Sequence, residues 1–114
     1  FLQAHRTTLA KNLSGGYRQL LSMACATIHN PKFIILDEPT SSIDPIFRRK
    51  FWDVVQKYKK NNSTILIITH YMEELLECDS FCCLNEGKIV HTGTVEELKK
   101  QNNFSIELLL RGLI

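Results

Sequence analysis

The residues with the clearest chemical potential are two carboxylates at the end of an apolar run. Residues 33–36 are Phe-Ile-Ile-Leu, and Asp37 and Glu38 follow them directly. In α/β proteins, acids at the carboxyl end of a buried strand lie at the edge where ligands bind. One such carboxylate can hold Mg²⁺, which takes oxygen ligands and keeps several waters. The second can orient or deprotonate an attacking water. The alternative is an acidic strand end that only meets solvent, but the apolar run and the Pro-Thr that follows favour a functional site.

A second candidate site is the segment Leu13-Ser14-Gly15-Gly16-Tyr17-Arg18-Gln19. Glycines at a helix start let backbone N–H groups approach an anion, and the helix dipole favours negative charge there. The Ser14 hydroxyl adds a donor. The structural alternative is a capped helix with no ligand. The 114 residues contain no G-x-x-x-x-G-K-[ST] phosphate loop, so phosphate binding by this segment would need a partner surface.

A histidine follows the second apolar run. His70 comes two residues after Ile65–Ile68, and at the edge of a sheet it could donate a hydrogen bond to a terminal phosphate. A single histidine after a strand is more often structural or at the surface. We retain His70 because its strand is expected in the same sheet as the two carboxylates, and we assign no role to the other three histidines.

The elements that must position these residues form an alternating pattern. Residues 33–37 and 65–69 are predicted strands of a parallel α/β sheet, and their continuous apolar character suits burial on both faces. Between them an apolar stripe predicts an amphipathic helix after Pro45, ending at residues 59–62. Ser14 is expected to cap a further helix from about residue 15 to residue 29. The stripe consists of Phe47, Phe51, Val54, Val55 and Tyr58.

The C-terminal part of the chain has a weaker pattern. Glu86-Gly87 is a turn dipeptide, and it predicts a hairpin between strands at 80–85 and 88–91. Residues 95–101 are expected to form a short helix. The structure of the tail from residue 102 is left open.

Composition limits the classes of protein that fit. The chain has 114 residues, 44% hydrophobic and 23% charged, with a formal net charge of +2. These values indicate one globular domain or part of a larger one, and they give no argument for a nucleic-acid partner. The six basic residues at positions 48–60 of the helix after Pro45 are interpreted as a solvated outer face rather than a nucleic-acid site. The apolar runs are strand-sized, so no segment is expected to cross a bilayer.

Cysteines at suitable spacing can ligate a metal ion, and the chain has four of them. Cys78 and Cys82 have ligand spacing, but no second pair or matching histidines accompany them,. Cys82 and Cys83 are neighbours on a predicted strand and should point to opposite faces. We therefore expect all four to be buried, reduced thiols in a cytosolic protein.

Taken together, four motifs in order resemble those of ABC ATPases. Residues 13–19 resemble the signature motif, 33–38 the Walker B strand, 42–44 the D-loop and 69–70 the switch histidine. The resemblance extends from about residue 8 to residue 100 and is strongest to ATPases of ABC-2 type exporters. It implies the C-terminal half of a P-loop NTPase (RecA-like) α/β domain with the end of its helical subdomain. Its regions would be 1–30 around the signature helix, 31–93 in the core, and 94–114 as a C-terminal helix and tail.

The resemblance also implies a role for each site residue. Asp37 would serve Mg²⁺, Glu38 would polarise the hydrolytic water, and His70 would contact the γ-phosphate of ATP. The remaining residues would act on ATP held by an opposing domain, because ABC ATPases work head to tail. This second group consists of Ser14, Gly15, Gly16, Gln19 and Asp44.

The implied partners are a second ABC ATPase domain, identical or not, and an integral membrane permease, without nucleic acid. The protein would lie in the cytoplasm, peripheral to the inner face of the cell membrane. The lysine loop and the adenine contact of the family would lie before Phe1, so the 114 residues alone are expected to be inactive. Two alternatives stay open: a degenerate domain that does not hydrolyse ATP, and an ABC protein acting on ribosomes or DNA.

Overall fold

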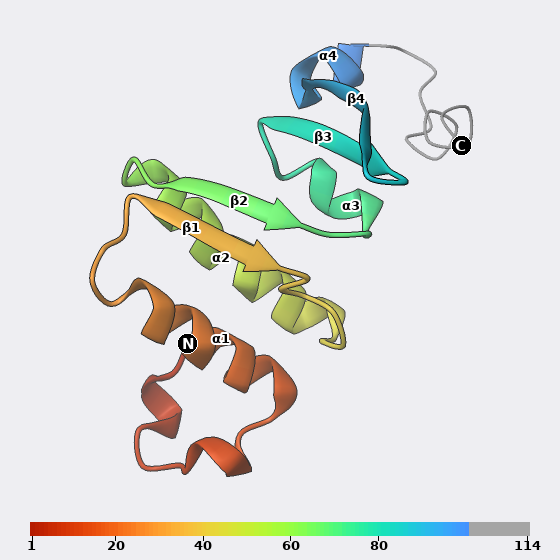
Figure 1. Cartoon of the computed structure of the whole chain (residues 1–114). Coiled ribbons are helices and arrows are strands. Elements are labelled where there is room, and N and C mark those ends of the chain that lie inside the picture. Colours follow the sequence, from red (N-terminus) through yellow and green to blue (C-terminus); the bar gives the residue numbers. More distant parts are fainter. Residues whose placement is uncertain (101–114) are drawn as a thin grey trace. The chain divides into compact units, whose positions relative to one another are not determined.

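The computed structural model describes residues 1–100, and these belong to two compact units. The first unit is Phe1–Ile68 and the second begins at Thr69, and Figure 1 shows the elements of each. The expectations for residue 101 and for the tail lie outside the described residues.

A parallel strand pair forms the centre of the first unit. Strand β1 (Phe33–Asp37) pairs with β2 (Thr64–Ile68), so that Ile35 lies opposite Leu66. Helix α2 (Pro45–Lys60) connects the two strands. Two parallel neighbouring strands require such a crossover because the chain must return from the end of the first strand to the opposite edge of the sheet before the second begins, and a short turn cannot span that distance. The predicted strand–helix–strand unit is thus confirmed, and β2 is shifted by one residue from the expected 65–69.

Both α-helices of the first unit begin at a side-chain cap. Helix α1 (Gly15–Thr27) follows Ser14, whose Oγ accepts a hydrogen bond from the Tyr17 N–H at 3.4 Å. It ends two residues before the predicted limit. Helix α2 has Pro45 in its first turn and stops at Asn61, and Asn62 has a positive φ of 65°. Two short 3-10 helices, η1 (Gln3–His5) and η2 (Ala10–Asn12), precede α1.

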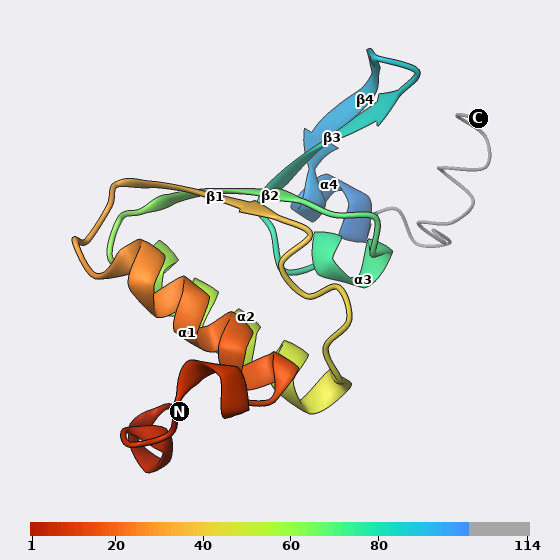
Figure 2. The ribbon, with the colours of Figure 1, turned by 60° about the horizontal axis from the view of Figure 1, so that its bottom comes forward.

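The core of the first unit lies between the strands and these helices. Figures 1 and 2 show α1 and α2 on the same side of the β1–β2 pair. Of the predicted stripe, Phe51 and Val55 are buried, but the buried Trp52 was not assigned to it. The apolar core of this unit consists of Leu13, Leu20, Met23, Ile34, Phe51, Trp52 and Val55.

The outer face of the strand pair differs from the prediction. Ile35 is 59% exposed and Leu66 is 48% exposed, and Phe33 and Ile68 share this face. The expectation of strands buried on both faces is therefore wrong for residues 1–100. Successive side chains of a strand alternate between faces, and the helices of this unit cover only the face that carries Ile34. An apolar layer is left open to solvent.

A partly buried polar contact joins the C-terminal ends of α1 and α2. The Tyr58 hydroxyl donates a hydrogen bond to Thr27 Oγ1 at 2.6 Å. The Thr27 hydroxyl in turn donates to the Met23 carbonyl, also at 2.6 Å. Thr27 is 1% exposed. Because a buried hydroxyl without a partner is costly, this pair fixes how the C-terminal half of α1 lies on α2.

The second unit contains a hairpin and two short helices. Helix α3 (Met72–Leu75) precedes the antiparallel strands β3 (Ser80–Asn85) and β4 (Lys88–Thr94). The turn dipeptide Glu86-Gly87 has φ values of 48° and 74°, as a type I′ turn requires. The predicted hairpin is confirmed, with β4 three residues longer than expected.

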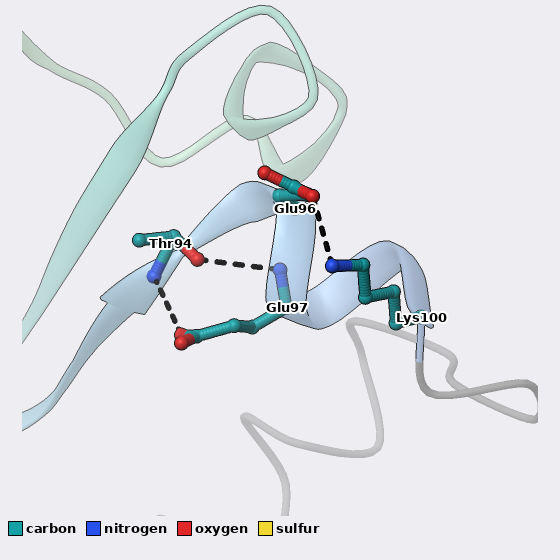
Figure 3. A network of polar contacts seen from close by, with 4 residues as sticks. All are labelled: Thr94, Glu96, Glu97 and Lys100. Carbon is teal, nitrogen blue, oxygen red and sulfur yellow. Dashed lines mark hydrogen bonds and ion pairs between the residues drawn. The ribbon is translucent and has the colours of Figure 1, made fainter.

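Helix α4 (Val95–Lys100) starts with a reciprocal cap that the sequence analysis did not identify. Thr94 Oγ1 accepts a hydrogen bond from the Glu97 N–H, and Glu97 Oε2 accepts one from the Thr94 N–H, both at 3.3 Å. Figure 3 shows these two contacts. Glu96 and Lys100 form an exposed ion pair at 2.8 Å one turn apart. The reciprocal hydrogen bonds between Thr94 and Glu97 form a capping box,, and its T-x-x-E spacing is readable from the sequence.

The cysteines correct a further expectation. All four are free, but Cys25 and Cys82 are exposed rather than buried. Cys82 and Cys83 do point to opposite faces of β3, as their exposures show. Partial burial, together with the neighbouring Cys82, raises the pKa of the Cys83 thiol. Among residues 1–100, no helix combines the length and apolar character that a bilayer span requires.

The contact between Tyr58 and Thr27 gives a stability prediction. Tyr58→Phe removes the hydroxyl donor but keeps the ring, so it should lower the free energy of unfolding by about 1 kcal/mol. The measurement is urea unfolding of the protein with and without this substitution. Tyr17→Phe is the matched control, since its hydroxyl has no hydrogen bond within residues 1–100. Equal effects of the two substitutions would contradict the assignment.

Candidate functional site

The two strand-end carboxylates lie at the carboxyl edge of the β1–β2 pair, as predicted. Asp37 is the last residue of β1, is exposed, and lies opposite Ile68. Glu38 continues the pairing, because its N–H donates to the Ile68 carbonyl at 2.8 Å. The backbone then turns at Glu38, whose φ is +48°, and its side-chain Oε2 is buried. The two acids therefore have different surroundings: Asp37 faces solvent and Glu38 is partly enclosed.

The positive φ of Glu38 marks a tight change in chain direction. A non-glycine residue in this region is uncommon and is maintained only where neighbouring contacts impose it. Here Ser41 supplies such contacts, because its N–H and its hydroxyl both donate to the Glu38 carbonyl, at 3.2 and 3.0 Å. Pro39 and Thr40 are fully buried. These contacts fix the turn that carries the chain from the end of β1 toward α2.

The glycine segment forms the exposed start of α1. Ser14 and Gly15 are exposed, whereas Gly16 is buried. A Cβ at Gly15 would meet no atom within 4 Å, but a Cβ at Gly16 would overlap the Phe47 ring and lie 2.8 Å from the Phe47 Cβ. The two glycines thus have different structural roles. Gly15 leaves its backbone open to an approaching group, and Gly16 allows close packing against α2.

Asp44 has a structural contact that the sequence analysis did not predict. Its Oδ1 accepts hydrogen bonds from the N–H groups of Ile46 and Phe47, at 3.0 and 3.1 Å. It is therefore the N-cap of α2, and Asp-Pro before an amphipathic stretch is a readable signal for this. The carboxylate is exposed, so a further group can still approach its outer side.

An aromatic cluster packs beside the starts of both helices. The Tyr17 ring lies 4.1 Å from the His5 ring and 4.7 Å from the Phe47 ring, centroid to centroid. Lys50 Nζ lies 4.7 Å from the Phe47 centroid and 5.7 Å from that of Tyr17. In the sequence analysis Tyr17 is named only as a member of the segment 13–19 and is assigned no role. Its partners lie on η1 and α2, and no spacing rule connects them.

The two remaining candidate site residues are Gln19 and His70. Gln19 is half-buried on α1, one turn beyond the glycines. His70 belongs to the second unit, is exposed, and its ring lies 4.3 Å from the Tyr71 ring. The Tyr71 N–H donates to Thr69 Oγ1 at 3.0 Å, which stabilises the turn after β2. In the first unit, the structure brings the starts of α1 and α2 together through Gly16 and Phe47.

This combination defines a class of protein: a parallel α/β fold with acids at a strand end and a glycine-opened helix start. Comparisons with known proteins specify the class further. The family described as "ABC transporter" matches residues 2–41. The chain is 38% identical over 87 residues to YbhF of Escherichia coli K12, a probable multidrug ABC transporter ATP-binding protein. That match covers 76% of this chain and 15% of YbhF.

Other relatives carry different transport names. The chain is 39% identical over 90 residues to EcfA1 of Caldanaerobacter subterraneus, an energy-coupling factor transporter ATP-binding protein, covering 78% of this chain and 32% of EcfA1. It is 40% identical over 99 residues to human ABCA4, a retinal-specific phospholipid-transporting ATPase, covering 86% of this chain and 4% of that protein.

Solved structures agree with the sequence matches. The ATP-binding cassette MJ1267 superposes with a TM-score of 0.73 at 32% identity, covering 79% of this chain and 36% of that one. An ATP-binding subunit of an ABC transporter gives a TM-score of 0.77 at 26% identity, with 94% and 46% covered. The chain belongs to the family of ABC transporter ATP-binding domains and has their P-loop NTPase fold. It spans less than half the length of each of these relatives.

The different surroundings of the two glycines give a direct test. Gly16→Ala should destabilise the protein by about 1–3 kcal/mol, because overpacking forces the Phe47 side chain and its backbone to shift. Gly15→Ala adds a methyl group in open space and should change stability by less than about 0.5 kcal/mol. Thermal or urea unfolding of both variants measures the difference. A Gly15 variant that is as unstable as the Gly16 variant would contradict the packing described here.

Proposed function

We propose that this chain is part of the ATP-binding and ATP-hydrolysing subunit of an ABC exporter. The observation that carries the proposal is the end of β1, where exposed Asp37 and partly enclosed Glu38 lie side by side on a constrained turn. The open start of α1 at Ser14 and Gly15 supports it. The substrate of the reaction would be ATP and its products ADP and phosphate.

Asp37 is proposed to serve Mg²⁺. Its exposed carboxylate at the strand end is the kind of hard oxygen donor that this ion takes, with water and substrate phosphates completing the coordination. When bound, Mg²⁺ neutralises charge on the phosphates and polarises them. In this proposal Asp37 holds its carboxylate toward the nucleotide.

Glu38 is proposed to orient and activate the attacking water. A general base must come within hydrogen-bond reach of the proton that it accepts, and the turn contacts from Ser41 to the Glu38 carbonyl restrict where its side chain can lie. His70 is proposed to donate a hydrogen bond to the γ-phosphate. Its exposed ring after β2 supports this role.

The start of α1 is proposed to act on ATP held by a second ABC ATPase domain, identical or different. Ser14 would donate its hydroxyl to the γ-phosphate, and Gly15 and Gly16 would present backbone N–H groups at the positive end of the helix. Gln19 would lie at the margin of this contact. Asp44 would approach across the same interface with the carboxylate face that does not cap α2.

The exposed outer face of β1 and β2 supports a larger domain in the complete protein. Ile35 is 59% exposed and Leu66 is 48% exposed, and burying such apolar side chains under further elements would lower the free energy of the folded protein. We propose that further elements of an ATP-binding domain, including a phosphate loop, cover this face. An integral membrane permease would complete the exporter, and the subunit would lie at the cytoplasmic face of the membrane.

Substitution of the proposed base tests the catalytic assignment. In the complete protein, Glu38→Gln should lower the rate of ATP hydrolysis by about 100-fold or more, the range that general-base catalysis contributes. ATP-dependent dimers should persist, because the amide keeps the shape of the side chain. Phosphate release and size-exclusion chromatography with ATP measure the two effects. Unchanged hydrolysis would remove Glu38 from this role.

The 114-residue chain alone tests the need for further elements. It should bind ATP weakly and hydrolyse none, since Ser14, Gly15 and Asp37 contact only parts of the nucleotide in this proposal. Calorimetry with MgATP on the chain, compared with the complete protein, measures the difference. Micromolar affinity of the chain alone would refute the proposal that a separate phosphate loop is required.

A further inference from the structure

We infer that Phe47 is a positioning residue that joins the glycine start of α1 to the Asp44-capped start of α2. The inference rests on the proposed function, in which both helix starts act on the same nucleotide. It adds a residue to which none of the motifs assigns a role.

Phe47 touches both helix starts directly. Its ring occupies the space that a Cβ at Gly16 would need. Its backbone N–H donates to Asp44 Oδ1 at 3.1 Å. One residue therefore contacts the second glycine of α1 through its side chain and the cap of α2 through its backbone.

Two further groups restrain the ring. Tyr17 meets it edge-on, with an interplanar angle of 77° and a centroid separation of 4.7 Å, a favourable aromatic geometry. Lys50 Nζ lies 4.7 Å from its centroid, within the range of a cation–π contact. Because Tyr17 is on α1 and Lys50 is on α2, both helices act on the ring and its position is well determined.

This packing determines the distance between Ser14 and Gly15 on one side and Asp44 on the other. If the ring were replaced by a smaller side chain, α1 could shift toward α2, since Gly16 has no side chain to stop it. Groups that act together on one ligand lose much of their effect when they are misplaced by about 1 Å. Phe47 would then influence the nucleotide without touching it.

The test uses the complete protein carrying Glu38→Gln, so that hydrolysis does not remove ATP. Phe47→Leu should raise the ATP concentration needed for half-maximal dimer formation by about tenfold, and Phe47→Tyr, which keeps the ring, should restore it. The amide resonances of Gly15 and Gly16 should move in Phe47→Leu and return in Phe47→Tyr.

Phe51→Leu is the matched control, because Phe51 is a buried phenylalanine on the same helix whose ring packs on Trp52. It should lower thermal stability and leave the ATP dependence unchanged. Equal shifts of the ATP dependence in Phe47→Leu and Phe51→Leu would overturn the inference and leave a general structural role.

Ser14→Ala separates this result from a failure of the proposed function. If Ser14→Ala weakens the ATP-dependent dimer while Phe47→Leu behaves like Phe51→Leu, only the role of Phe47 is wrong. If Ser14→Ala leaves the dimer unchanged, the glycine start of α1 does not contact ATP, and both proposals are overturned.

Discussion

The parallel pairing of β1 with β2 is the constraint on which the first unit depends. Parallel neighbours cannot be joined by a short turn, so the chain between Asp37 and Thr64 must leave the strand end and return along a helix. The turn at Glu38, its positive φ and the Ser41 contacts are consequences of that path. The acids lie at the carboxyl edge because the crossover begins there.

The same crossover brings α2 against α1, and this contact determines how the starts of the two helices lie. Glycine at position 16 permits close contact with Phe47, while the pair Tyr58 and Thr27 fixes the far ends of both helices. The two starts, one opened by glycine and one capped by Asp44, are thus held near each other by packing. A backbone N–H cluster that binds anions gains from such preorganisation, because its groups need no rearrangement when the ligand arrives.

Much of this arrangement could be predicted from local signals in the sequence. Apolar runs gave both strands, Ser14 and Pro45 gave the helix starts, and Glu86-Gly87 gave the hairpin. These signals are short-range, since each depends on a strand period, a cap or a turn. The exposed outer face of β1 and β2 could not be predicted, because a continuous apolar run does not tell how many layers cover it within residues 1–100. Contacts such as Tyr17 with Phe47 join residues 30 positions apart, and periodicity indicates faces without naming their partners. The site roles stay predictions, since they depend on a nucleotide and a second domain.

We propose that the end of β1 in one ATPase domain and the start of α1 in an opposing domain act on the same ATP. A structure of the complete protein carrying Glu38→Gln, with ATP and Mg²⁺, tests it most directly. We expect the side chain at position 38 to lie about 3 Å from a water in line with the γ-phosphate, and Ser14 of the opposing domain to contact that same phosphate. A nucleotide bound elsewhere, with either group turned away from it, would contradict the account.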